Sequence, residues 1–169
     1  MSETQDQQTP AGQGADWLND TTDYQRCFVC GMRNPFGLHM HFHSEDGRIV
    51  AEFTGDERHQ GFPGVVHGGI LAALLDETMG RVPVLEHRWV MTGRLELRYR
   101  MPAPIQVPLR IVAEALDVRR SMARIKGRIT HADDPTIVCC EAEGMFLPLP
   151  PEVRDKAVGD WPGLKNFFT

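Results

Sequence analysis

The sequence predicts an α+β domain in which one long apolar helix packs against a curved antiparallel sheet of about six strands. Three observations predict this fold class. An apolar run with helical periodicity occupies residues 67 to 82, approximately. Two short strand-like runs precede it, and four more follow it. The connections are short, which favours antiparallel pairing because parallel strands need long crossovers.

The length and charge of the chain limit what it can be. A chain of 169 residues suits one domain with a real core. Residues 1–22 are rich in Gln, Thr, Gly and Asp and are expected to form a disordered arm, with the domain over 23–169. The formal net charge of -5 argues against nucleic acid as the main partner.

The expected setting is the cytoplasm, without a membrane partner. No stretch is apolar and long enough to span a bilayer. The first residues lack the basic start and apolar segment of a signal peptide. In a reducing compartment the four cysteines would remain thiols.

The first two strands are expected to form a hairpin. The pair Asp46-Gly47 is a strong signal for a two-residue turn. Before it, apolar and histidine residues alternate with a period of two, so the histidines should share one exposed face. The apolar positions are Leu38, Met40 and Phe42, and the histidines are His39, His41 and His43.

The predicted helix has two different faces. A helical wheel gathers large side chains on one side, which is expected to contact the sheet: Leu71, Leu74, Leu75, Thr78 and Val82. The opposite side is almost all small and carries one carboxylate: Gly69, Ala72, Ala73, Asp76 and Gly80. A second copy of the helix could approach this small face closely, which predicts a twofold homodimer. Glu77 and Arg81 are expected to form an ordinary exposed pair.

The remaining strands are expected over 91–101, 106–116, 122–131 and 136–147. In the first of these, one face carries Arg94, Arg98 and Arg100, and the other carries Leu95, Leu97 and Tyr99. Arg119 and Arg120 form a basic turn, where a phosphate-bearing ligand could be held. Ordinary solvated charge is the alternative for all these arginines.

The start of the helix, His67-Gly68-Gly69, carries the first chemical signal. Free N–H groups at a helix start can stabilise an oxyanion, and glycines let a ligand approach them. Asp76 lies eight residues further, about 12 Å along the axis. Both groups can therefore meet one carbonyl only if they come from two antiparallel helices in a dimer. Alternatively, the glycines are only a turn and Asp76 is a structural carboxylate.

These residues resemble the hotdog-fold thioesterases. The segment "GFPGVVHGGILAALLDE" is similar to the G-x-P-G-x-x-H-G-G-x6-D core of acyl-CoA thioesterases. Downstream, "MTGRLELRYRMPAPI" resembles a family strand with a threonine near its start, and "CFVCGMRNPFGLHMHF" resembles the opening of a bacterial branch. The resemblance covers residues 27 to 148, approximately. It implies a helix wrapped by an antiparallel sheet, dimers or dimers of dimers, and sites at the dimer interface.

The resemblance also implies roles for particular residues. Asp76 would be the nucleophile or the general base for water, and Thr92 would position the water or the carboxylate. The Gly68 amide would polarise the thioester carbonyl, with His67 beside the acyl group and Gly69 close to the substrate. Some relatives carry Asn or Gln where this chain has Gly61. Gln60 is the candidate substitute. Arg119 and Arg120 would hold the phosphates of CoA, and no cofactor is expected.

Three other functions compete with acyl-CoA hydrolysis. A noncatalytic acyl-CoA-binding or sensor module would use the same fold. A hydratase of this fold would carry a histidine five residues after the aspartate, where this chain has Arg81. The third is a metal-bound interaction module built on the cysteines. Cys27-x-x-Cys30 is half of a possible zinc site, but no second ligand pair is visible, so no metal is expected.

Overall fold

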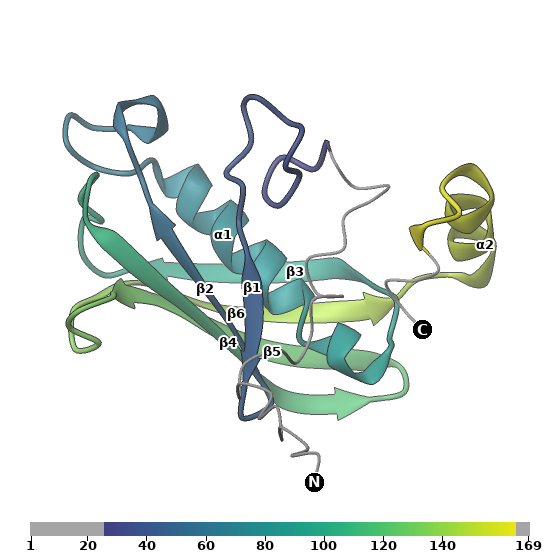
Figure 1. Cartoon of the computed structure of the whole chain (residues 1–169). Coiled ribbons are helices and arrows are strands. Elements are labelled where there is room, and N and C mark those ends of the chain that lie inside the picture. The colour runs from purple at the N-terminus through teal and green to yellow at the C-terminus, as the bar shows by residue number, and fades with distance from the viewer. Residues whose placement is uncertain (1–25, 165–169) are drawn as a thin grey trace, which may run out of the picture.

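The computed structural model describes residues 26–164, so the arm predicted over residues 1–22 lies outside the described residues. One long helix, α1 (Gly68–Gly80), lies across one face of a single six-stranded sheet (Figure 1). The strands are β1 (Phe42–Glu45), β2 (Arg48–Thr54), β3 (Val90–Tyr99), β4 (Pro108–Arg119), β5 (Met122–His131) and β6 (Val138–Pro148). The predicted α+β class is confirmed.

The sheet has the order β1-β2-β4-β5-β6-β3, and every neighbouring pair is antiparallel. Strand β3 follows the helix in sequence but pairs with β6, the last strand. The predicted strands appear within a few residues of their expected bounds. The structure adds a short helix α2 (Pro151–Asp160), which the sequence analysis did not assign.

The first hairpin forms as predicted, with a shorter first strand. Asp46 and Gly47 both have positive φ, 50° and 75°, which a tight two-residue turn requires. Strand β1 begins only at Phe42 because His39 has a φ of 52° and interrupts the extended backbone. The burial pattern is nevertheless the expected one, with the three histidines exposed and the apolar positions between them buried.

Helix α1 buries its large face against the sheet. Its buried side chains are Leu71, Leu74, Leu75, Thr78 and Met79. Glycine in the sheet allows this close approach, since a Cβ on Gly127 would lie 2.9 Å from Met79 Sδ and 3.0 Å from Leu75 Cδ2. The expected sheet-facing stripe is therefore correct, with Met79 added and Val82 buried just beyond the end of the helix.

One expectation for the helix is wrong: the Glu77–Arg81 pair is not exposed. Arg81 donates to Glu77 at 3.1 Å, but its side chain is only 5% exposed. The guanidinium lies over the ring of Phe42, 4.1 Å from the centroid. The wheel placed Arg81 outside the core because it ignored the chain segment that precedes β1 and covers this side of the helix.

Strand β3 is one of the two edge strands of the sheet, and most of its residues are exposed. Leu95 and Leu97 face the helix and are partly buried against the core. Among the described residues, no helix combines the length and the apolar character that crossing a membrane requires.

Replacing Leu75 with alanine should lower the free energy of unfolding by about 2–5 kcal/mol, because the residue is fully buried and the helix cannot collapse into the space. Urea unfolding at fixed protein concentration measures the change. Leu116→Ala is the matched control, since Leu116 is 42% exposed and its truncation should cost less than about 1 kcal/mol. Equal losses in the two variants would contradict this description of the core.

Candidate active site

The start of α1 is held by the loop that precedes it. The backbone N–H of His67 donates to the carbonyl of His59 at 2.8 Å, and that of Val66 donates to Ala103 at 2.8 Å. His67 is the N-cap residue, and its ring Nδ1 accepts the N–H of Gly69 at 2.9 Å. A side-chain acceptor at this position satisfies one of the free donors of the first turn.

Two glycines leave room for the His67 ring. A Cβ on Gly61 would lie 2.9 Å from Cδ2 of the ring, and a Cβ on Gly69 would lie 3.1 Å from Nδ1. Because Nδ1 accepts a hydrogen bond, the neutral ring carries its proton on Nε2. His67 therefore presents an N–H donor at the exposed start of the helix.

The His67 cap accepts the N–H of Gly69 but not that of Gly68. The Gly69 N–H is taken by His67, whereas the Gly68 N–H belongs to the first turn, where the helix offers no acceptor. The carbonyl of Gly68 accepts the hydroxyl of Tyr99 at 3.0 Å. No sequence pattern indicates this role for Tyr99. It links the end of β3 to the start of α1.

The structure brings Asp76 and Thr92 together. Thr92 Oγ1 donates to Asp76 Oδ1 at 2.8 Å, although 16 residues separate them in the chain. Asp76 is partly exposed and Thr92 is exposed, so the pair lies at the surface beside the edge strand. The hydrogen bond fixes one carboxylate oxygen and leaves Oδ2 for another molecule.

A β-bulge makes this contact possible. In the pairing of β3 with β6, Thr92 lies opposite Phe146 and Arg94 lies opposite Met145, so Gly93 is the extra residue. Strict alternation would place Thr92 on the face of Arg94, away from the helix. The bulge turns it to the helix face with Leu95. A Cβ on Gly93 would lie 2.9 Å from Leu147 Cδ1, which favours glycine there.

The amide of Gln60 is used within its own loop. Its Oε1 accepts the N–H of Gly64 at 2.6 Å, and its Nε2 donates to the carbonyl of Glu57 at 3.2 Å. Gln60 therefore shapes the loop before the helix. Gly61 has no side chain, and the His67 ring occupies the direction that one would take.

The basic turn lies at the same end of the sheet as Thr92. Thr92 pairs with Phe146, Phe146 with Ala123, and Ala123 with Val118, next to Arg119. Three strand spacings place Val118 about 14 Å from Thr92. Arg119 forms an ion pair with Asp117 at 2.7 Å, and the turn is braced by Arg88, which donates to the carbonyl of Arg119.

Within one chain the predicted residues form two groups. His67, Gly68 and Gly69 lie at the start of α1, and Asp76 lies with Thr92 near its end. Eight residues of helix separate Gly68 from Asp76, about 12 Å along the axis. A single carbonyl cannot contact both groups in one chain.

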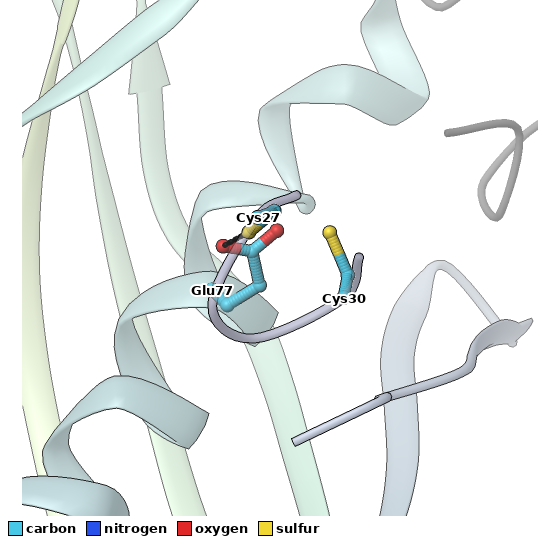
Figure 2. Close-up of side chains that lie close together, drawn as sticks. All are labelled: Cys27, Cys30 and Glu77. Atoms are coloured by element: carbon cyan, nitrogen blue, oxygen red, sulfur yellow. Dashed lines mark hydrogen bonds between the residues drawn. The ribbon is translucent and has the colours of Figure 1, made fainter. Parts of the chain in front are cut away.

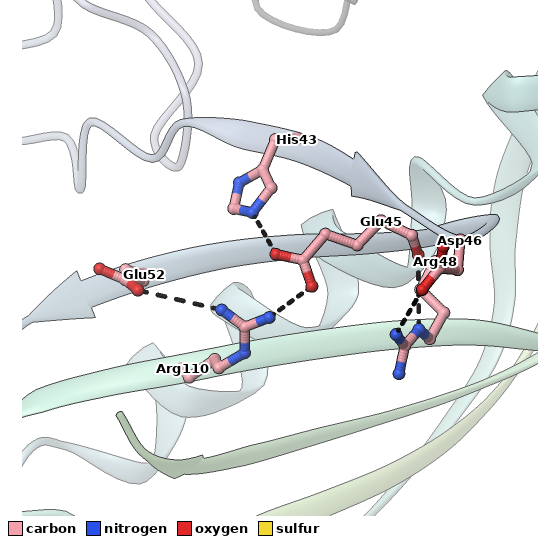
Figure 3. Close-up of polar contacts among 6 residues, drawn as sticks. All are labelled: His43, Glu45, Asp46, Arg48, Glu52 and Arg110. Carbon is pink, nitrogen blue, oxygen red and sulfur yellow. Dashed lines mark hydrogen bonds and ion pairs between the residues drawn. The ribbon is translucent and has the colours of Figure 1, made fainter. Parts of the chain in front are cut away.

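The outer face of the sheet carries charge in both signs. A groove there is lined by Arg98, Glu114, Lys126, Glu141 and neighbouring residues, on the side away from the helix and from Asp76. On the edge strand β1, the Glu45 carboxylate accepts hydrogen bonds from His43 at 2.8 Å and from Arg110 at 2.6 Å (Figure 3). These bonds, that of His43 first, hold the pKa of Glu45 below its usual value. Such exposed pairs contribute little stability.

Cys27 and Cys30 face one another beside the helix. A hydrogen bond from Cys30 lowers the pKa of the Cys27 thiol to about 6, and the same bond together with burial raises the pKa of Cys30. Cys139 and Cys140 are buried on β6. All four cysteines are free thiols.

A long apolar helix packed against a six-stranded antiparallel sheet is the hotdog fold. A crystal structure of a thioesterase superfamily protein shares the fold, with a TM-score of 0.65 and 32% identity over 70% of this chain and 61% of that one. A family model described as "Thioesterase superfamily" matches residues 63–138, which include His67, Asp76 and Thr92. Over this region the chain is similar to the thioesterase superfamily, and the predicted resemblance is confirmed.

Two named relatives are acyl-coenzyme A thioesterases. Acyl-coenzyme A thioesterase THEM4 of Mus musculus is 32% identical over 142 residues, which cover 80% of this chain and 57% of the mouse protein. Acyl-coenzyme A thioesterase THEM5 of Homo sapiens is 31% identical, over 64% of this chain and 43% of that protein. The chain thus spans about half the length of these relatives. A hypothetical thioesterase of Streptococcus pneumoniae, solved with coenzyme A, has the same fold at a TM-score of 0.60 and 20% identity over 65% of this chain and 85% of that one.

Replacing Gly61 with alanine should displace the His67 ring and weaken its cap on Gly69. The expected loss is about 1 kcal/mol of unfolding free energy, as for the loss of a helix N-cap, and urea unfolding measures it. Gly159→Ala is the control, because a Cβ there meets nothing within 4 Å and its residue lies in helix α2. If Gly61→Ala is as stable as the wild type and His67 keeps its cap in a crystal structure, the steric role of Gly61 is wrong.

Proposed function

We propose that the protein is an acyl-CoA thioesterase, which hydrolyses an acyl-CoA thioester to the free acid and CoA. The observation that carries this proposal is the 2.8 Å hydrogen bond from Thr92 to Asp76. It orients a carboxylate at an accessible surface, as a nucleophile or general base requires. Similarity to the thioesterase superfamily and the names of the relatives support the reaction class.

Asp76 would act through Oδ2, the oxygen that Thr92 leaves unbound. As a general base, Oδ2 would take a proton from water while the water oxygen attacks the thioester carbon. As a nucleophile, Oδ2 would attack that carbon itself, and water would then hydrolyse the resulting anhydride. In the general-base route, the proton taken by Asp76 would pass to the CoA sulfur as the carbon–sulfur bond breaks. In the nucleophilic route, CoA would leave as a thiolate when the anhydride forms and would take a proton from solvent, and hydrolysis of the anhydride by water would restore the carboxylate. Thr92 has the same role in both routes.

The other half of the site would come from a second subunit. The Gly68 amide and the Nε2–H of His67 are donors at the start of the helix, suited to the oxygen of a thioester carbonyl as it gains negative charge. They lie too far from Asp76 to act with it in one chain. We therefore propose an antiparallel arrangement in which these donors face Asp76 of the partner subunit.

The nucleotide end of CoA would lie toward the basic turn. Arg119 and Arg120 lie at the end of the sheet that also carries Thr92. The guanidinium of Arg119 is mostly exposed despite its pair with Asp117, so a phosphate can reach it. The Streptococcus pneumoniae protein solved with coenzyme A shares the fold.

Replacing Asp76 with asparagine should lower kcat at least about a hundredfold, because the amide keeps the size of the side chain but is neither base nor nucleophile. Thr92→Ala should cost less, about tenfold, since it removes one hydrogen bond to the carboxylate. Release of free CoA thiol from a panel of acyl-CoA substrates measures both changes. Thr92→Ser keeps the hydroxyl and is the matched control.

Full activity in Asp76→Asn would show that the carboxylate has a structural role and would contradict its catalytic role. A second outcome favours the noncatalytic sensor: neither wild type nor variant releases CoA, yet both bind acyl-CoA with equal affinity in calorimetry. Circular dichroism of each variant shows whether a loss of activity reflects unfolding.

The two-subunit site requires the protein to assemble as a dimer or a dimer of dimers. The half-buried Ala73 lies on the small face of α1, so Ala73→Leu should overpack a close helix contact between subunits. Sedimentation of the wild type should show a dimer or a dimer of dimers at micromolar concentration. The variant should dissociate at lower concentration and lose activity with the dimer. A wild type that is monomeric and active would overturn the two-subunit site.

A further inference from the structure

The segment before β1 places two thiols against helix α1. Cys27 and Cys30 lie in a turn closed by the bond from Gly31 N–H to the Cys27 carbonyl, 3.0 Å long. Figure 2 shows both cysteines on this turn and Glu77 reaching toward them from the helix. The sulfurs and one carboxylate oxygen all lie within 4.8 Å of one another. The sequence could not show this third group, because 47 residues (77 minus 30) separate it from Cys30.

The turn is held firmly in place. The N–H of Leu38 donates to the Phe28 carbonyl at 2.8 Å, and the N–H of Met40 donates to the Val29 carbonyl at 2.9 Å. These bonds join the cysteine turn to the chain that leads into β1. The thiols therefore face Glu77 from a fixed backbone, which is the condition for a preformed ligand site.

The three groups match the ligands of a thiolate-preferring divalent ion. Bonds of 2.0–2.3 Å in a tetrahedral zinc site put neighbouring ligand atoms about 3.5–3.8 Å apart. Cys27 Sγ lies 3.9 Å from Glu77 Oε2, and small side-chain rotations would bring all three ligand atoms to the distances that a tetrahedral zinc site requires. Cys30 is buried and Cys27 is partly exposed, so water can occupy the fourth position from the side of Cys27.

The surrounding charge also fits a divalent ion. Two thiolates and one carboxylate carry three negative charges, and a divalent ion leaves a net charge of minus one. Arg81, paired with Glu77 at 3.1 Å and almost completely buried, supplies the balancing positive charge. A neutral total matters here because an unbalanced charge beside the core is costly.

We propose that Cys27, Cys30 and Glu77 bind one Zn²⁺ ion, which fastens the segment before β1 to helix α1. Binding forms two sulfur–zinc bonds and one oxygen–zinc bond, and it releases to solvent any proton still on either thiol. This site is independent of thioester hydrolysis. It revises the expectation of no metal, which rested on the lack of a second ligand pair in the sequence.

Cobalt(II) is the probe of choice, since thiolate ligands give it an intense near-ultraviolet charge-transfer band that nitrogen and oxygen ligands do not. Reduced, chelator-treated wild-type protein should bind one cobalt per chain with this band. Zinc should displace the cobalt, and elemental analysis should then find one zinc per chain. Zinc should also raise the melting temperature.

Variants locate the ion. Cys27→Ser should weaken cobalt binding at least about tenfold and halve the band, and Glu77→Gln should weaken binding by a similar factor while keeping both thiolates. Cys139→Ala removes a thiol elsewhere and should change nothing, as should Glu86→Gln on an exposed carboxylate. Cys27 is only partly buried, so its variant should disturb packing less than a core mutation would, and circular dichroism checks its fold.

Three results would each overturn the site. The reduced wild type gives no thiolate–cobalt band, or the band keeps its full intensity in Cys27→Ser and disappears in Cys139→Ala. The third is a Cys27–Cys30 disulfide found by mass spectrometry in protein purified without a reductant, together with no metal in the reduced form.

Discussion

The burial of the large face of α1 against the sheet is the constraint on which the rest of the structure depends. Leu74 and Leu75 are fully buried, and glycine at 127 lets the helix lie close to β5. Once this face is turned inward, the helix has no freedom to rotate. Asp76 then lies at the partly exposed side next to β3, and Glu77 lies under the cysteine turn. Successive residues of a helix point about 100° apart, so the adjacent carboxylates of Asp76 and Glu77 contact different groups: Thr92 of β3 and Cys27 of the turn.

Strand β3 turns this helix orientation into a site. It contacts α1 at two points: the Tyr99 hydroxyl bonds the Gly68 carbonyl, and the Thr92 hydroxyl bonds Asp76. Between these points Leu95 and Leu97 pack on the core. The two hydrogen bonds are exposed and join particular atoms of β3 and α1. Between them, Leu95 and Leu97 contribute apolar packing, which does not depend on such precise geometry. The edge strand of this sheet therefore both covers the helix and orients the Asp76 carboxylate.

Much of this arrangement could be predicted from the chain itself. Period-two and helical patterns placed every strand and the long helix, and the Asp46-Gly47 turn fixed the first hairpin. The patterns failed where a local rule was broken by contacts distant in sequence. The bulge at Gly93 reverses the alternation, so the contact of Thr92 with Asp76 followed only from family resemblance. The burial of Arg81 and the approach of Glu77 to the cysteines depend on how the segment before β1 crosses the helix, which no periodicity reports. The position of each site residue relative to a second subunit is likewise not encoded in any local pattern.

The pairing of β3 with β6 has a kinetic consequence. Between the end of β3 at Tyr99 and the start of β6 at Val138 the chain makes the whole β4–β5 hairpin, and β3 has no other strand partner in the described sheet. Pairing of strands so distant in sequence is slow, because the loop between them must close before the contacts form. During synthesis, the helix and Thr92 leave the ribosome well before β6 does. The Thr92–Asp76 geometry is therefore completed only after β6 has been synthesised, and until then β3 is an unpaired edge that a chaperone or a second nascent chain can bind.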